Sequence, residues 1–198
     1  CSASADLMDL TAAKGLLYCL LGLFVLVAWA RERRKRRLTG EPEKFWPGTT
    51  YAPMGAYYAA AAGAILITIA EAAVEKRAGL TDQQSILPAV FLFQLLGASV
   101  IEEALFRGFV APGELMGRKL LALMIIGSLV FALIHNFDLS TAEGKVNATF
   151  AFITSLWLYV VRFNPLNPDR SLLPCFMAHT VRNLAVFGIK ASQGFITW

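Results

Sequence analysis

Charged residues are scarce in this chain: 16% of its 198 residues are Asp, Glu, Lys or Arg, while 57% are hydrophobic. A soluble domain is roughly a quarter charged and about half apolar, so the usual aqueous surface cannot be built here. High hydrophobicity with little charge excludes intrinsic disorder, and three cysteines cannot form a disulfide scaffold. We therefore expect the apolar side chains that cannot be buried in a core to contact membrane lipid.

The positive charge is concentrated in one place. A basic run at 31–37 directly follows the apolar stretch 14–30, and the net charge of the chain is +4. A basic run beside an apolar segment is typical of a cytoplasmic membrane flank, so we expect membrane lipid and no nucleic acid as a partner. The residues before the first segment then lie outside the cytoplasm.

Six apolar segments follow one another, separated by breakers rich in Gly, Pro or charge. They cover residues 14–30, 52–74, 86–110, 120–135, 146–161 and 172–189. These runs are too long and continuous for barrel strands, which predicts an all-α fold, a polytopic transmembrane bundle of about six membrane segments. Several fall short of the ~20 residues that span a bilayer, so we expect tilted or partly penetrating helices.

A Pro- and Gly-containing linker at 39–51 divides the chain. It predicts an N-terminal transmembrane helix with a basic cytoplasmic linker at 1–50 and a core at 51–198. The second segment is rich in Ala and Gly, which lets helix backbones approach closely in lipid, so we place it inside the bundle.

Glu102, Glu103 and Arg107 are ionisable residues inside an apolar segment, where such side chains usually face the bundle interior. Glu103 and Arg107 are four residues apart and can form a charge-assisted pair on one helix face. Glu102 points about 100° away and is left unpaired, as a general base would be. The alternative, given even weight, is that the pair is only a structural clamp.

Both histidines also fall in apolar segments. His135 lies four residues after Phe131, and Asn183 lies four residues after His179, so each pair shares a helix face. Such a histidine is more often an interhelical hydrogen-bonding group than a catalyst. However, both histidines, the tandem glutamates and Asn183 all lie in apolar segments, and this combination favours a catalytic site.

A hairpin turning at 117–119 has two arms of nearly equal length, roughly 22 to 26 Å at a rise of 1.5 Å per residue. This predicts that Glu103 and His135 lie at one depth. It also requires segment 86–110 to bend near Gly97.

The motifs EExxxR at 102–107, FxxxH at 131–135 and HxxxN at 179–183 resemble, in order, those of the CPBP (Abi) family of intramembrane proteases. That family includes the type II CAAX prenyl endopeptidases and bacteriocin-processing or immunity proteins. The resemblance covers about half the chain, 86–189. It implies intramembrane hydrolysis of a peptide bond by a glutamate-activated water.

The resemblance also implies residue roles. Glu102 would take a proton from water and His135 would hold that water. His179 and Asn183 would polarise the scissile carbonyl and stabilise the oxyanion. Glu103 with Arg107 would orient the glutamate helix, and Phe131 would pack the fourth segment.

The residues allow a metal-free and a zinc-dependent mechanism. The spacing HExxH of many zinc proteases is absent, and the asparagine in the last motif favours a metal-free glutamic mechanism with no cofactor. In the alternative, zinc would be held by four side chains. They are Glu102, Glu103, His135 and His179.

The expected substrate is a membrane-anchored or lipidated peptide or protein, and compact size favours a prokaryotic inner membrane. Two other functions compete: a non-proteolytic scaffold or immunity protein of the same fold, and a proton-coupled transporter, which internal repeats would have favoured. Basic residues in the loops 117–119 and 162–170 predict that these face the cytoplasm. The level of Glu102 and His135 then lies towards the other leaflet, unlike the cytosolic site of CAAX-processing relatives.

Overall fold

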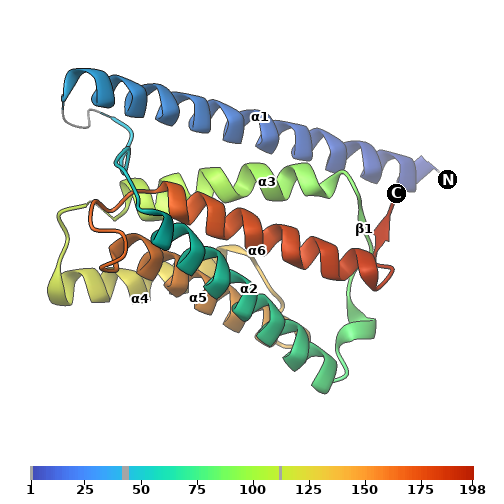
Figure 1. The fold of residues 1–198 in the computed structure, drawn as a ribbon. Coiled ribbons are helices and arrows are strands. Elements are labelled where there is room, and N and C mark those ends of the chain that lie inside the picture. The colour runs from blue at the N-terminus through green and yellow to red at the C-terminus, as the bar shows by residue number, and fades with distance from the viewer. Residues whose placement is uncertain (1, 42–44, 112) are drawn as a thin grey trace.

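The computed structural model describes residues 2–41, 45–111 and 113–198; the side chains of 2–11 and of Gln83 are not described. The described chain is an all-α bundle, as predicted (Figure 1). Its α-helices are α1 (Ser2–Thr39), α2 (Met54–Arg77), α3 (Phe91–Glu102), α4 (Gly117–Ile134), α5 (Ala142–Phe163) and α6 (Leu173–Ser192). The shorter elements are η1 (Thr81–Gln83), the π-helix η2 (Glu103–Phe109), and the parallel pair β1 (Leu87–Pro88) and β2 (Ile196–Thr197).

Four helices of the described chain are long and apolar enough to cross a membrane. They are Ala12–Thr39, Met54–Arg77, Gly117–Ile134 and Ala142–Phe163. The remaining two predicted segments are α3, which is only 12 residues long and runs on into η2, and α6, which carries polar side chains among its apolar positions. The chain is therefore an integral membrane protein.

The helices pack in a simple pattern. α1 lies along α3, α2 packs against α6 and α5, and α4 packs against α5. The end of α1, the starts of α2, α4 and α6 and the end of α5 meet at one end of the bundle, on the left of Figure 1. We call this the basic end, because it carries the run 31–37 and Arg118, Lys119 and Arg170. The loops 78–90, 135–141 and 193–198 lie at the opposite end.

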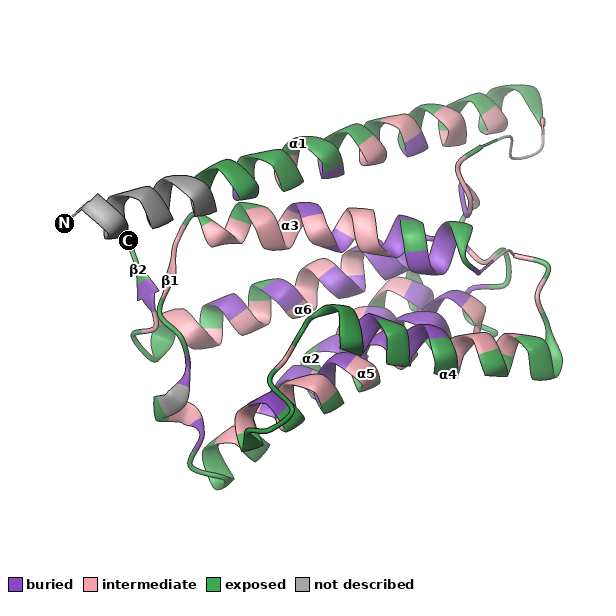
Figure 2. Cartoon of the chain, turned by 180° about the vertical axis from the view of Figure 1, so that it is seen from behind, coloured by how far each residue is buried: buried purple, intermediate pink, exposed green. Residues whose placement is uncertain are grey.

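Small residues of α2 face its neighbours, as the sequence predicted, but α2 does not lie inside the bundle: its other side is at the surface, with Tyr58 70% and Leu66 66% exposed. Ala56, Ala60 and Ala64 recur every fourth residue and are buried. The Trp157 indole of α5 donates a 3.1 Å hydrogen bond to the Ala60 carbonyl, and a Cβ on Gly63 would collide with the same indole, so α5 packs tightly on this part of α2. Figure 2 shows the same principle across the bundle, with buried residues where helices meet and exposed residues along the outer face of α1.

The predicted bend near Gly97 is wrong. α3 is α-helical through Gly97, and its hydrogen-bond pattern changes only at Glu103, where η2 begins. Gly97 has a different role: it is the point where α1 crosses α3, with Gly22 facing it. A Cβ on Gly97 would collide with the Tyr18 carbonyl, which is backbone and cannot move aside cheaply.

Gly97→Ala should therefore destabilise the protein despite the higher helix propensity of alanine. Overpacking of this kind costs roughly 1–3 kcal/mol. Thermal melts in detergent measure the effect. Gly188→Ala is the matched control, because Gly188 is a helical glycine of α6 whose added Cβ meets open space. Equal melting temperatures for the two variants would show that α1 can move away from α3.

Candidate active site

The Glu103–Arg107 pair forms inside the bundle as the sequence predicted. Both side chains have no exposed surface, and Nη1 of Arg107 lies 3.0 Å from Oε1 of Glu103. Nη2 of Arg107 also donates to the carbonyl of Ser155 at 2.9 Å and to its hydroxyl at 2.5 Å. η2 is thus tied to α5, and the guanidinium is held by groups from two elements.

His179 completes this cluster in a way that helical spacing alone did not reveal. Its Nδ1 lies 2.8 Å from Oε1 of Glu103, the same oxygen that Arg107 contacts. A carboxylate oxygen only accepts, so Nδ1 carries the proton. The ring is thereby oriented with Nε2 towards Glu102, 3.9 Å from its Oε2. We call Glu103, Arg107 and His179 the buried triad.

Glu102 is placed differently from Glu103. Its side chain keeps 23% of its exposure, while that of Glu103 has none. Arg107 and Nδ1 of His179 both contact Glu103, whereas Glu102 makes no ion pair with an arginine among the described side chains. This matches the predicted division of the tandem glutamates into a clamp and an unpaired carboxylate.

Phe131 packs against both the triad and His135. Its ring centroid lies 6.1 Å from that of His179 and 4.7 Å from that of His135. The Arg107 guanidinium carbon lies 4.9 Å from the Phe131 centroid and 4.7 Å from that of Tyr159, a cation–π arrangement on two rings. Phe131 therefore orders the triad as well as packing α4.

His135 caps the C-terminus of α4 and is exposed, unlike His179. Its Nδ1 lies 2.7 Å from the carbonyl oxygen of Phe131, and its ring stacks on Phe137 at 5.6 Å. The carbonyl accepts, so Nδ1 carries the proton and the neutral ring presents Nε2 as an acceptor. Phe131 lies at the level of Arg107, and His135 and Glu103 each lie one helical turn closer to the opposite end, which agrees with the predicted common depth.

Asn183 projects from α6 one turn beyond His179. It is 6% exposed, and its Nδ2 donates to the Leu95 carbonyl of α3 at 3.1 Å. One amide N–H is therefore fixed on α3, and the amide has a second N–H to offer.

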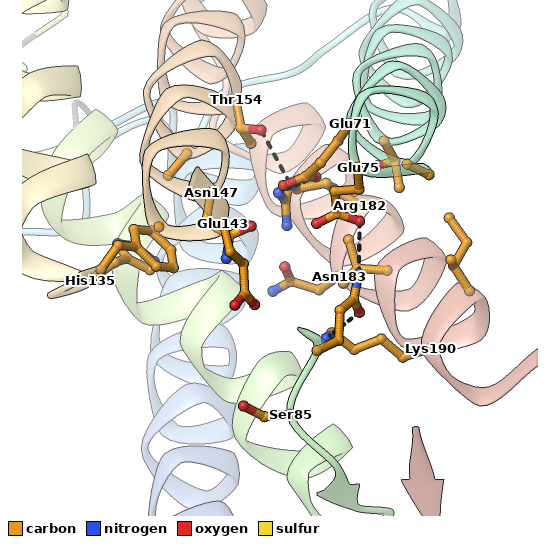
Figure 3. A pocket seen from close by; sticks show the side chains of 18 of the residues that line it. Glu71, Glu75, Ser85, His135, Glu143, Asn147, Thr154, Arg182, Asn183 and Lys190 are labelled. Atoms are coloured by element: carbon orange, nitrogen blue, oxygen red, sulfur yellow. Dashed lines mark hydrogen bonds and ion pairs between the residues drawn. The ribbon is translucent and has the colours of Figure 1, made fainter. Parts of the chain in front are cut away.

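A cavity of about 470 Å³ joins these side chains. His135, His179, Asn183 and Phe131 line it. Figure 3 shows His135 and Asn183 beside residues of α2 and α5 that line the same cavity. Glu102 does not line the cavity, but its Oε2 lies 3.9 Å from Nε2 of His179, which does. The structure thus brings His179 and both glutamates into one cluster and places His135 and Asn183 on the wall beside it.

Sequence reasoning missed the ion pair between Glu71 and Arg182, which lines the same cavity. Nη2 of Arg182 lies 2.8 Å from Oε2 of Glu71, and Nε of Arg182 donates to the Thr154 hydroxyl at 3.1 Å. This contact ties α6 to α2 and α5. Both charged residues lie in apolar segments, so the argument that singled out the histidines could have found them.

The four donors of the zinc alternative do not gather around one point. Oε1 of Glu103 contacts Arg107 and Nδ1 of His179, and Nδ1 of His135 contacts the Phe131 carbonyl, so Nε2 is the nitrogen of each ring that a metal could bind. Among the side chains that the structure describes, no three His, Cys, Asp or Glu residues form a group with metal-binding geometry. These described side chains, as they are arranged, do not fit a zinc ion.

Comparison with known proteins supports the resemblance that the motifs carried. No curated protein and no solved structure matches the chain. Residues 84–185 match the family described as type II CAAX prenyl endopeptidase Rce1-like, and this range contains the buried triad, Glu102, Phe131, His135 and Asn183. About half of the chain is matched, so the protein belongs to the Rce1-like family of type II CAAX prenyl endopeptidases.

Proposed function

We propose that the protein is an intramembrane endopeptidase in which Glu102 activates water. Membership of a protease family supports peptide-bond hydrolysis. The role of Glu102 is proposed from the orientation of His179. This residue lines the cavity, its Nδ1 is held by Glu103, and its Nε2 is directed towards Glu102.

In the proposed mechanism, Glu102 accepts a proton from a water molecule as the water oxygen attacks the scissile carbonyl carbon. Nε2 of His135 accepts a hydrogen bond from the same water and holds it. The proton then passes from Glu102 to the amide nitrogen as the C–N bond breaks. The products are a carboxylic acid and an amine.

The developing oxyanion needs hydrogen-bond donors, and His179 and Asn183 are proposed to supply them. Asn183 has its second amide N–H for this purpose. His179 donates from Nε2 only when both ring nitrogens carry protons, and the carboxylates of Glu102 and Glu103 beside it pair with such an imidazolium. In this proposal, Glu103 and Arg107 contribute to the reaction by holding the His179 ring in one orientation.

The proposed substrate is a membrane-anchored or lipidated peptide, in a prokaryotic inner membrane. A cavity of about 470 Å³ lies within the usual range of binding sites, about 300–1,000 Å³. Since the site lies between membrane helices, a substrate anchored in the same bilayer is held close to it.

The test is cleavage by the purified full chain in liposomes. Membrane-anchored peptides are incubated with wild type and with His179→Ala, and products are identified by mass spectrometry. Site-specific cleavage by wild type alone supports the proposal. Peptides that bind to wild type and stay intact would favour the scaffold or immunity function.

Activity should persist in the presence of a chelator. No three His, Cys, Asp or Glu side chains of the described residues gather into a metal-binding group, and the proposed steps use side chains only. Elemental analysis of active protein and assays with and without chelator check this. The metal-free mechanism is wrong if active protein carries about one zinc per chain, as a catalytic zinc site would, and loses activity that only metal restores.

A further inference from the structure

The cavity occupies only one half of the bundle's length. Its lining on α2 begins at Thr68, late in that helix, and its lining on α5 ends at Thr154, before that helix reaches the basic end. On α6 it runs from His179 to Lys190, near the C-terminus (Figure 3). The loop 135–141 contributes five further residues, His135 to Asp138 and Thr141. All of these lie towards the opposite end.

Between the cavity and the basic end the interior is packed. Arg107 and Tyr159 have no exposed surface and Arg162 has 1%. Arg162 lies closer to the basic end than Tyr159, and its guanidinium donates hydrogen bonds to the carbonyls of Gly108 and Ala111. A substrate therefore reaches His179 from the opposite end or from lipid beside it, since these side chains close the path from the basic end.

The two ends differ in charge. The basic end carries the run 31–37 and the exposed residues Arg118 and Lys119. The opposite end carries the exposed residues Lys76, Arg77 and Lys145, so fewer Lys and Arg residues lie there than at the basic end. The cavity at this end is lined by four acidic residues and two basic ones: Glu71, Glu75, Asp138 and Glu143, with Arg182 and Lys190. Lys and Arg in short loops beside membrane helices are retained in the cytoplasm. The basic end is therefore cytoplasmic.

We infer that the cavity opens on the non-cytoplasmic side of the membrane and takes a peptide segment presented from that side. Cleavage of the segment rests on the proposed function, whereas the direction of the opening does not. From His179 to Lys190 the cavity follows α6 for about 16 Å at 1.5 Å per residue. An extended chain covers that depth with about five residues at ~3.3 Å each. The substrate class is a membrane protein or peptide whose cleaved bond lies about five residues inside its non-cytoplasmic boundary.

Cysteine labelling in intact cells tests the direction without any use of activity. Ser85→Cys, at the exposed rim of the cavity, is compared with the exposed Lys119→Cys at the basic end. Both are made in the full chain with Cys1→Ser; Cys175 is fully buried and Cys19 lies within an apolar helix, so a membrane-impermeant maleimide does not reach them. Leu139→Cys and Leu166→Cys, one exposed residue from each end, repeat the comparison if either first variant fails to accumulate.

The expected result is labelling of Ser85→Cys in intact cells and loss of that labelling in inverted vesicles, with the reverse for Lys119→Cys. The reverse pattern, or equal labelling of both variants in intact cells, overturns the inference. A protein that labels as expected and cleaves no peptide would overturn the proposed function and leave the direction of the opening established.

Discussion

Glu102→Gln is expected to reduce the rate of peptide cleavage by about 10²–10⁴, the typical contribution of a general base. The amide is nearly isosteric with the carboxylate but does not take a proton from water. The fold should be unaffected, because Glu102 is partly exposed and the buried triad does not include it. Initial rates with a reconstituted membrane-anchored peptide measure the effect, and a thermal melt checks the fold.

Glu114→Gln is the matched control, since this exposed glutamate lies outside the site. It should cleave at the wild-type rate. If Glu102→Gln also does so, Glu102 is not the base, and Glu103→Gln becomes the next variant to measure. A loss of both activity and melting temperature in Glu102→Gln would instead assign this glutamate to the packing of the bundle.

Arg107→Ala is expected to cause the largest loss of stability among single changes in the site. It removes the guanidinium that faces Glu103, and both side chains are fully buried. Leaving one member of a buried ion pair unpaired costs roughly 3–5 kcal/mol. The change also removes two hydrogen bonds to Ser155 and the contacts with the rings of Phe131 and Tyr159. Melting temperatures in detergent are the measurement.

A double variant separates charge from packing. Glu103→Gln with Arg107→Met removes both charges and restores part of the volume, so it should recover much of the stability lost in Arg107→Ala. It should remain inactive, because an amide is a weaker partner than a carboxylate for Nδ1 of His179. An unchanged melting temperature for Arg107→Ala would mean that water reaches the pair and that the clamp is not needed.

Sequence periodicity predicted the contacts that lie within one helix. Six apolar runs became six helices, and the four-residue spacing of Glu103 and Arg107 became a 3.0 Å ion pair. These features depend on hydropathy and on local geometry, both of which can be read along the chain.

Contacts between helices lay beyond such reasoning. The bond from His179 to Glu103 joins residues 76 apart, and that from Arg107 to Ser155 joins residues 48 apart. Helical spacing gives the face on which a side chain lies but not the helix that this face meets. The error at Gly97 has the same origin: a glycine in a helix predicts either a bend or a close crossing, and only the position of α1 decides between them.

Arg162 shows how a charge near a helix end can mislead. Its position beside a Pro- and Asn-rich loop indicated a cytoplasmic surface residue, yet it is 1% exposed and donates to backbone carbonyls. The orientation of the bundle therefore depends on the run 31–37 and on Arg118 and Lys119, which are at the surface.

The π-helix η2 determines which changes of chain length the protein tolerates. An i→i+5 ladder encloses one residue more per turn than an i→i+4 ladder, so loss of one residue within 104–106 lets η2 relax into an ordinary α-helix with its backbone bonds remade. The same loss rotates Arg107 about the helix axis, away from Ser155, so the hydrogen bond between these two residues breaks. A related sequence with a one-residue gap here would keep the helix and lose its register with α5, so alignment gaps at this position distinguish relatives that share the fold from those that share the site.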